Sequence, residues 1–217
     1  MVFFDMHSHN LSEEENALVI LNQYPLSAQT ESFFSVGIHP WYLEDWEKQW
    51  TKMRPLASHQ NCLAVGECGL DKNISAHFEL QQEIFKKHIE LSEELKKPLI
   101  IHCVKAYDEV IRLKKQYKPE QMWVIHGFRK NEKTALNLIK VGIKLSFGKA
   151  LLSDESLQKT FRNLPQDSFF LETDNTHIPI SHIYQKAIEI RQNLDDFTKM
   201  KMFFISDKIH NILINSK

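Results

Sequence analysis

Short apolar runs alternate with longer segments of helical periodicity along almost the whole chain, and this alternation is the strongest constraint on the fold. The predicted strands cover residues 2–4, 17–22, 33–37, 63–66, 99–101, 123–125, 143–146 and 169–171. The predicted helices cover residues 44–58, 77–96, 107–117, 132–141, 154–164, 183–191 and 195–209, and Ser153 is placed to cap the helix at 154–164. Strands separated by helices are typical of βαβ units, in which neighbouring strands run parallel.

Eight such strands predict a (β/α)8 TIM barrel that forms a single domain over residues 1–217, because no linker, repeat or low-complexity tract divides the chain. Residues 23–32, between the second and third strands, are too few for a crossover helix, so we expect a barrel trimmed in its N-terminal part. The competing layout is an open doubly wound sheet. The turn after the first strand lacks a Gly-x-Gly-x-x-Gly sequence, which weakens the dinucleotide-binding form of that layout.

Composition limits the kind of partner. Lys and Arg number 27 and Asp and Glu number 28, which gives a net charge of -1. Proteins that hold a long stretch of nucleic acid usually carry a basic excess, because phosphate contacts supply most of their affinity, so we expect a compact site. The three cysteines, Cys62, Cys68 and Cys103, indicate reduced thiols in a cytoplasmic protein. The chain has no signal-peptide pattern and no long apolar run, so we expect neither secretion nor a membrane span.

Two histidines, His7 and His9, follow the first predicted strand. Side chains at i and i+2 of an extended backbone point to the same face, so these two imidazoles can bind one metal ion. The His-x-His pattern alone is weak, because it fits two surface histidines near a chain terminus equally well.

Residues of metal-ligand type also follow four later strands: Glu67, His102, His126 and Asp174. In a (β/α)8 barrel the carboxyl ends of the strands converge on one mouth, where catalytic groups lie. The sequence therefore predicts a joint metal site. Four imidazoles and two carboxylates exceed one tetrahedral shell, so we expect two divalent ions with Glu67 between them. Their identity stays open among zinc, manganese, iron and magnesium, of which magnesium is the least usual partner of imidazole.

The chain resembles the TatD-type metal-dependent deoxyribonucleases, within the amidohydrolase-like barrels. The motifs that carry the resemblance are Asp-Met-His-Ser-His (5–9), Val-Gly-Ile-His-Pro (36–40), Gly-Glu-Cys-Gly-Leu-Asp (66–71), Pro-Leu-Ile-Ile-His-Cys (98–103), Ile-His-Gly-Phe (125–128) and Glu-Thr-Asp (172–174). They lie in the family's order and cover most of the chain. The resemblance implies hydrolysis of DNA that depends on a divalent metal, often by trimming from the 3′ end.

The resemblance also implies roles. One metal shell comprises His7, His9, Glu67 and Asp174, and the second comprises Glu67, His102 and His126. Asp174 and Glu67 are the expected catalytic residues, with Asp174 as the general base, and His39 is expected to face the substrate without binding metal.

The residues after Cys103, His126 and Asp174 differ from those usual in the family, so the predicted shell matches the family while the substrate rim does not. On this rim Lys105 and Arg129 are candidates for phosphate binding, or are solvated loop charges. His177 is a further candidate for the mouth.

Four more residues leave two interpretations open. Trp41 and Tyr42 can offer a base-stacking surface or pack against the barrel. Glu172 can orient a ligand or serve the barrel itself. Cys68 adjoins a predicted ligand, but the alternation of the strand points it away from the site, so we expect it to pack in the core.

We conclude that the sequence predicts a divalent-metal-dependent phosphodiesterase or deoxyribonuclease acting on a DNA 3′ end or a small phosphodiester. Two alternatives remain: a metal-dependent C–N hydrolase acting on a small anionic substrate, and a metal-holding binding protein without turnover. Fold alone does not decide among them. The oligomeric state is not predicted.

Overall fold

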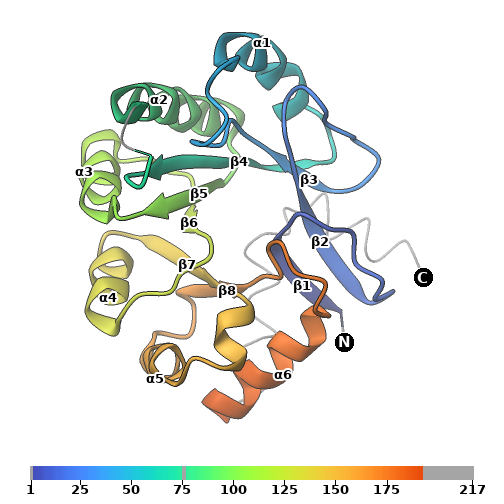
Figure 1. Cartoon of the computed structure of the whole chain (residues 1–217), viewed down its shortest axis with the longest axis vertical. Helices are drawn as coiled ribbons and strands as arrows, with labels where there is room; N and C mark the ends of the chain where they lie inside the picture. Colours follow the sequence, from blue (N-terminus) through green and yellow to red (C-terminus); the bar gives the residue numbers. More distant parts are fainter. Residues whose placement is uncertain (1, 75–76, 193–217) are drawn as a thin grey trace.

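The computed structural model describes residues 2–74 and 77–192 of the 217-residue chain. Eight strands form one sheet in sequence order, and each pairs in parallel with the next (Figure 1). The strands are β1 (Phe3–Ser8), β2 (Ala17–Gln23), β3 (Phe34–Val36), β4 (Cys62–Asp71), β5 (Leu99–Val104), β6 (Trp123–Ile125), β7 (Ile143–Phe147) and β8 (Phe169–Leu171). The predicted parallel (β/α)8 barrel is confirmed.

The first and last strands meet just beyond β8, and this contact brings the sheet round on itself. Ser8 forms a parallel bridge with Asp174. The Asp174 amide donates to the His7 carbonyl over 2.9 Å, and the His9 amide donates to the Asp174 carbonyl over the same distance. The ends of β1 and β8 are thus held together at the mouth of the barrel.

Helices lie around the outside of the strands (Figure 1). They are α1 (Trp46–Ala57), α2 (Phe78–Leu95), α3 (Tyr107–Tyr117), α4 (Glu132–Lys140), α5 (Glu155–Asn163), α6 (Ile180–Arg191) and the short 3-10 helix η2 (Lys149–Leu152). Among residues 2–74, the first helix comes only after β3, so the expected trimming of the N-terminal part is confirmed. The helix predicted at residues 195–209 lies outside the described residues.

Strand burial follows the helix pattern. Most strands are buried on both faces, as expected where helices cover a parallel sheet. In β2 buried and half-buried residues alternate, because only Leu18, Ile20 and Asn22 face the barrel interior. No helix in the described part of the chain is long and apolar enough to cross a membrane.

The fourth strand is longer than predicted. It continues from Gly66 to Asp71, and Gly69 lies opposite His102 of β5. A Cβ added to Gly69 would stand 2.1 Å from the His102 carbonyl oxygen, and the φ of Gly69 is +143°. Only glycine fits this close approach of two backbones. Glu67 therefore lies inside a strand, where pairing on both sides fixes its direction.

The predicted cap of α5 is wrong by one residue. Asp154 caps this helix, and its carboxylate accepts the Leu157 amide over 2.9 Å. Ser153 instead ends η2, whose presence the sequence pattern did not reveal. The last described helix, α6, begins at Ile180, three residues before the predicted start.

Candidate metal centre

Glu67 lies at the centre of a cluster of histidines at the carboxyl ends of the strands. Its Oε2 is 3.5 Å from Nε2 of His7 and 3.5 Å from Nε2 of His9. Its Oε1 is 2.7 Å from Nε2 of His126 and 3.0 Å from Nδ1 of His102. The two oxygens of one carboxylate therefore face two different pairs of imidazoles, one pair from β1 and its end, the other from β5 and the end of β6.

Asp174 completes the arrangement on the side of β1. Its Oδ1 is 3.9 Å from Nε2 of His7 and 3.6 Å from Nε2 of His9. The φ of Asp174 is 54°, a left-handed conformation that aspartate tolerates better than most residues. The backbone bonds to His7 and His9 hold this conformation and keep the carboxylate in the mouth, where 33% of the side chain is exposed, against 3% for Glu67.

The residues fit a metal ion by their own hydrogen-bond deficit. His7 is fully buried, and neither of its ring nitrogens has a hydrogen-bond partner; Nδ1 of the buried His126 also has none. Buried polar atoms without partners are costly, and a cation with imidazole and carboxylate ligands would satisfy them. Three groups have ligand atoms close enough to hold an ion: His7, His9 and Glu67; His7, His126 and Asp174; and His39, Glu67 and His102.

The six predicted ligands are thus brought together, and their role as ligands stays a prediction. Burial raises the pKa of Glu67, but the charge of His126 and hydrogen bonds from the surrounding histidines outweigh it and hold this pKa well below its usual range. Burial lowers the pKa of His126, but the charges of Glu67 and Glu172 outweigh it and raise this pKa well above its usual value. Without a metal, Glu67 and His126 therefore form an ion pair.

His39 is buried in the same cluster. Its Nδ1 accepts the Trp41 amide over 3.1 Å, so a neutral ring carries its proton on Nε2. That Nε2 lies 3.1 Å from Oε1 of Glu67, a donor position. This arrangement favours hydrogen bonding to Glu67 over metal binding, although His39 is buried and does not line an open substrate surface as the sequence suggested.

Two carboxylates support the outer nitrogens of the histidines. Oδ2 of Asp71 is 3.3 Å from Nε2 of His102, which leaves Nδ1 of His102 free to face Glu67. Oε1 of Glu172 is 3.7 Å from Nδ1 of His126 and accepts the Gly127 amide over 2.6 Å. Carboxylates in such positions fix the tautomer and orientation of metal-binding histidines.

Sequence reasoning missed Asp71, and with it Asn22 and Tyr24. Asp71 ends the Gly-Glu-Cys-Gly-Leu-Asp motif, which was the available signal. Asn22 Oδ1 accepts the Glu67 amide over 3.1 Å, but a lone asparagine in a predicted strand carries no such signal. Burial, aided by the charge of Glu67, raises the pKa of Tyr24 to about 12, so its hydroxyl stays protonated beside the cluster.

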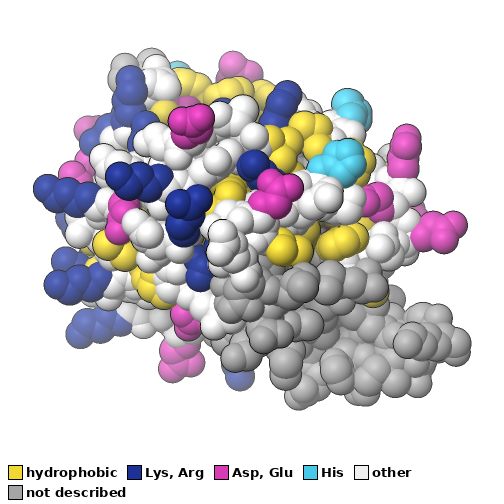
Figure 2. Space-filling model, turned by 90° about the horizontal axis from the view of Figure 1, so that it is seen from below, with side chains coloured by type: hydrophobic (Ala, Val, Ile, Leu, Met, Phe, Trp, Pro, Cys, Tyr) yellow, Lys and Arg dark blue, Asp and Glu magenta, His cyan; other side chains and the backbone are white. Residues whose placement is uncertain are grey.

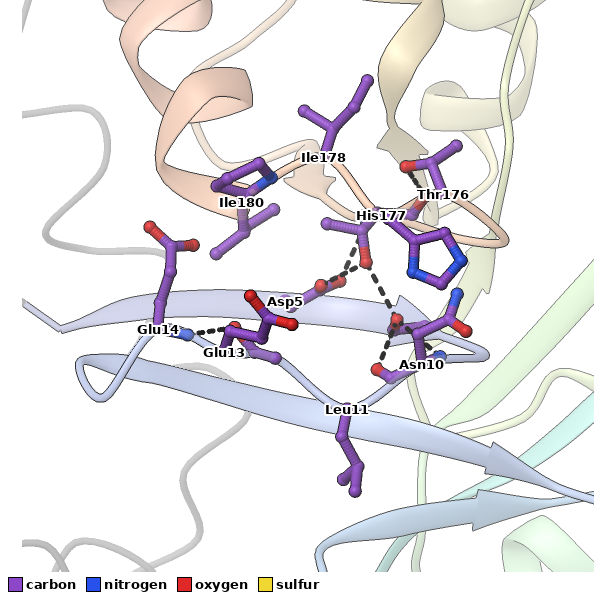
Figure 3. A pocket seen from close by; sticks show the side chains of 13 residues that line it. Asp5, Asn10, Leu11, Glu13, Glu14, Thr176, His177, Ile178 and Ile180 are labelled. Carbon is purple, nitrogen blue, oxygen red and sulfur yellow. Dashed lines mark hydrogen bonds between the residues drawn. The ribbon is translucent and has the colours of Figure 1, made fainter.

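A pocket of about 260 Å³ lies beside this cluster, between the end of β1 and the loop before α6 (Figure 3). Asp5 lies at its base, where its carboxylate accepts the amide and the hydroxyl of Thr173 over 3.0 and 2.6 Å. Burial raises the pKa of Asp5 to about 7. The exposed His177 lines this side pocket together with Asn10 and Thr176.

The predicted phosphate-binding residues lie on loops. Lys105 follows β5 with a φ of 55°, and Arg129 lies in the loop after β6. Both are exposed, and the described part of the chain gives neither side chain a hydrogen bond or an ion pair. Their role in binding substrate stays a prediction. Cys62, Cys68 and Cys103 are free and buried in the core, as expected.

Comparison with known proteins places these features in context. The sequence profile described as "TatD related DNase" matches residues 5–201. The chain is 31% identical over 149 residues to an uncharacterized metal-dependent hydrolase of Buchnera aphidicola, with 66% of this chain and 56% of that protein covered. It is 31% identical over 154 residues to the uncharacterized metal-dependent hydrolase YcfH of Escherichia coli K12, with 69% and 58% covered.

A third relative is the 3'-5' ssDNA/RNA exonuclease TatD of Erwinia tasmaniensis, 28% identical over 172 residues, with 76% of this chain and 64% of that protein covered. The matched region spans less than two thirds of the length of each of these relatives. Among solved structures, the TatD homolog YJJV of Escherichia coli K12 has a TM-score of 0.77 at 20% identity, with 91% of this chain and 94% of that chain covered. A TatD family hydrolase of Entamoeba histolytica has a TM-score of 0.75 at 14% identity, with 92% and 95% covered. These two likenesses show the barrel fold.

Proposed function

The chain belongs to the TatD-related DNase family, and from that premise we propose that it hydrolyses phosphodiester bonds at a centre of two divalent metal ions, trimming DNA from its 3′ end. The observation that carries the proposal is the position of Glu67, whose two oxygens face two separate pairs of histidines. A bridging carboxylate with imidazoles on both sides is the donor set that a pair of zinc or manganese ions requires.

The chain's own residues divide the work. His7, His9, Glu67 and Asp174 would hold one ion, and Glu67, His102 and His126 the other. Two ions held there would activate a water molecule and stabilise the leaving oxygen of a phosphate ester. Asp174 is the carboxylate of this set that is open to the mouth, so it is suited to accept the proton of the attacking water. Asp71 and Glu172 hold His102 and His126 in orientation.

The substrate side is lightly charged. Lys105 and Arg129 are exposed on neighbouring loops and are suited to a few phosphates. On the face drawn in Figure 2, basic side chains are interspersed with acidic ones, and the net charge of the chain is -1. Long phosphate tracks need a continuous basic surface. We therefore favour the end of a strand, or a small phosphodiester, as the substrate.

We also propose that residues 1–217 act as one domain and that the protein works in the cytoplasm. The direct contact of β1 with the end of β8 supports the first statement. The three unpaired cysteines support the second, since buried free thiols are typical of reducing compartments.

The test is a matrix of metals and substrates on the purified protein. The substrates are 3′-labelled single-stranded DNA, duplex DNA, RNA, small phosphodiesters and cyclic amides, each with zinc, manganese and magnesium. We expect cleavage of a phosphodiester with at least one metal. Cleavage of a cyclic amide alone would replace the proposal with a C–N hydrolase, and no turnover on any substrate would leave a metal-holding binding protein.

A further inference from the structure

Three aromatic side chains stand at the mouth of the barrel beside the candidate metal centre: Tyr24, Trp41 and Tyr42, called the aromatic rim below. Trp41 and Tyr42 are 53% and 50% exposed. They are the only aromatic residues among the large exposed hydrophobic side chains of the described residues. Single exposed apolar side chains are common on proteins, but adjacent exposed aromatic rings at a concave site indicate a binding surface.

The rim is continuous with the predicted metal ligands at both ends. The ring of Tyr24 lies 6.3 Å from that of His9 and 5.4 Å from that of Tyr42. At the other end, the Trp41 ring lies 5.9 Å from that of His102. These aromatic faces therefore extend along the mouth from a ligand of one predicted metal shell to a ligand of the other.

The orientation of Trp41 is fixed by polar contacts. Its indole N–H donates to Oδ2 of Asp71 over 2.8 Å, and its backbone amide donates to Nδ1 of His39. The next residue is also held, because the Tyr42 carbonyl accepts the side-chain amide of Gln49 over 2.7 Å. A ring that is anchored by its edge and still half exposed keeps its face available to a ligand at little cost in conformational entropy.

We propose that the aromatic rim is a stacking platform for an unpaired nucleobase of a single-stranded nucleic acid whose adjoining phosphate reaches the candidate metal centre. The inference rests on the proposed function and adds a substrate preference to it. Every base has a π face, so an aromatic platform binds bases without regard to sequence. Bases inside a duplex are already stacked on their neighbours, so a duplex must fray before a base can reach Trp41.

Affinity from stacking also complements the charge of the chain. A net charge of -1 leaves little attraction for phosphates, so a strand held only through Lys105 and Arg129 would bind weakly. Stacking on an aromatic side chain contributes affinity that does not depend on a basic surface.

The platform can be tested in metal-free protein by tryptophan fluorescence. The chain has four tryptophans, of which Trp123 is fully buried and Trp46 packs against the core, while Trp41 is half exposed. The ligands are a short single-stranded oligodeoxynucleotide and the same strand with abasic residues at its 3′ end. We expect the intact strand to quench the fluorescence and the abasic strand to quench it far less.

Three variants separate stacking from other effects. Trp41→Ala should weaken binding of the intact strand by roughly 5- to 100-fold and leave binding of the abasic strand unchanged. Trp41→Phe keeps an aromatic face and loses the indole, so binding measured by anisotropy of a labelled strand should stay within a few fold while the quenching disappears. Trp46→Phe, on α1, is the matched control and should keep both.

The outcomes for the platform and for the proposed function are distinct. Equal binding of intact and abasic strands by the wild type, or unchanged binding by Trp41→Ala, overturns the platform even if the protein cleaves DNA. Failure of the wild type to bind either strand also overturns it. Base-dependent quenching in a protein that cleaves no oligonucleotide with any metal supports the platform and removes the proposed function.

Discussion

The floor and the rim of the barrel mouth are built in different ways. The floor consists of residues in or directly after strands: His7, His9, Glu67, His102, His126 and Asp174. The rim consists of the aromatic rim together with Lys105 and Arg129, which lie on loops and are in part exposed. Strand pairing fixes the floor side chains to within hydrogen-bond range of one another, whereas rim side chains depend on loop paths and on single anchors such as Asp71.

This difference assigns different tasks to the two regions. Floor residues lie within reach of one carboxylate, Glu67, so a change there should alter metal binding and chemistry. Rim residues lie farther out and should alter which substrate binds and how strongly. Substitutions on either side can break this division or sharpen it.

The largest expected effect is the loss of metal from the floor. Elemental analysis after mild reconstitution should approach two divalent ions per chain in the wild type. Because Glu67 faces both histidine pairs, Glu67→Ala should reduce the content to well below one ion per chain. Glu83→Ala, an exposed change on α2, should keep the wild-type content. A wild-type value reproducibly below one, in folded protein, contradicts the two-ion proposal.

Asp174 should affect chemistry more than binding. Asp174→Asn keeps the shape and one ligand oxygen but loses the charge and the basicity. We expect an unchanged circular dichroism spectrum, substrate affinity within about tenfold, and turnover reduced by at least about 10²-fold, the lower end of the range for general-base catalysis.

The matched control for this change is Asp108→Asn, an exposed carboxylate on α3. It should keep wild-type turnover. If Asp174→Asn turns over within a few fold of the wild type under saturating metal, another residue accepts the proton.

Asp71 joins the floor to the rim, since it contacts both His102 and Trp41. Asp71→Asn should release both, and we expect about 10- to 100-fold weaker metal affinity, the range observed when a carboxylate behind a metal-binding histidine is removed. Calorimetric titration of metal into the metal-free protein measures this. Glu109→Gln, whose partner is Lys72 outside the site, serves as control. Unchanged metal affinity in Asp71→Asn would mean that the floor does not depend on the rim.

The floor was more predictable from sequence than the rim, for a physical reason. Strand periodicity and the carboxyl ends of parallel strands determine where residues such as His7 and His126 point, and short motifs mark them. The order of strands and helices follows from the same periodicity. The full length of β4 did not, because it depends on the close approach of Gly69 to His102 of another strand.

Contacts between distant parts of the chain explain the other misses. Asn22 reaches Glu67 across 45 residues, and Asp71 meets Trp41 across 30. The spacing of residues in one sequence contains no information on such pairs. The cap at Asp154 was missed because the pattern did not show that η2 precedes it.

The smallest expected effect on chemistry comes from His88, which supports the rim from behind. Its Nε2 accepts the Ile38 amide over 3.0 Å, next to His39, and its Nδ1 donates to the Ile84 carbonyl over 2.8 Å. This bonding requires a neutral ring, and complete burial lowers the pKa of His88 from 6.5 to about 4. The unfolded chain therefore binds more protons than the folded one between about pH 6.5 and pH 4. The stability from neutral His88 is complete above pH 6.5 and is lost as the pH falls through this window.

Urea unfolding at several pH values tests this role of His88. Between pH 7 and pH 5 the wild type should lose on the order of 2 kcal/mol through this residue. His88→Gln can still accept the Ile38 amide and does not titrate, so its unfolding free energy should depend less on pH, while its folded fraction keeps activity. His182→Gln, an exposed change on α6, should follow the wild-type pH curve. If His88→Gln and the wild type have parallel curves, protonation of His88 does not limit acid stability. If His88→Gln stays folded but loses turnover, the anchor behind the rim also determines the geometry of the floor, and the division between the two regions fails at this point.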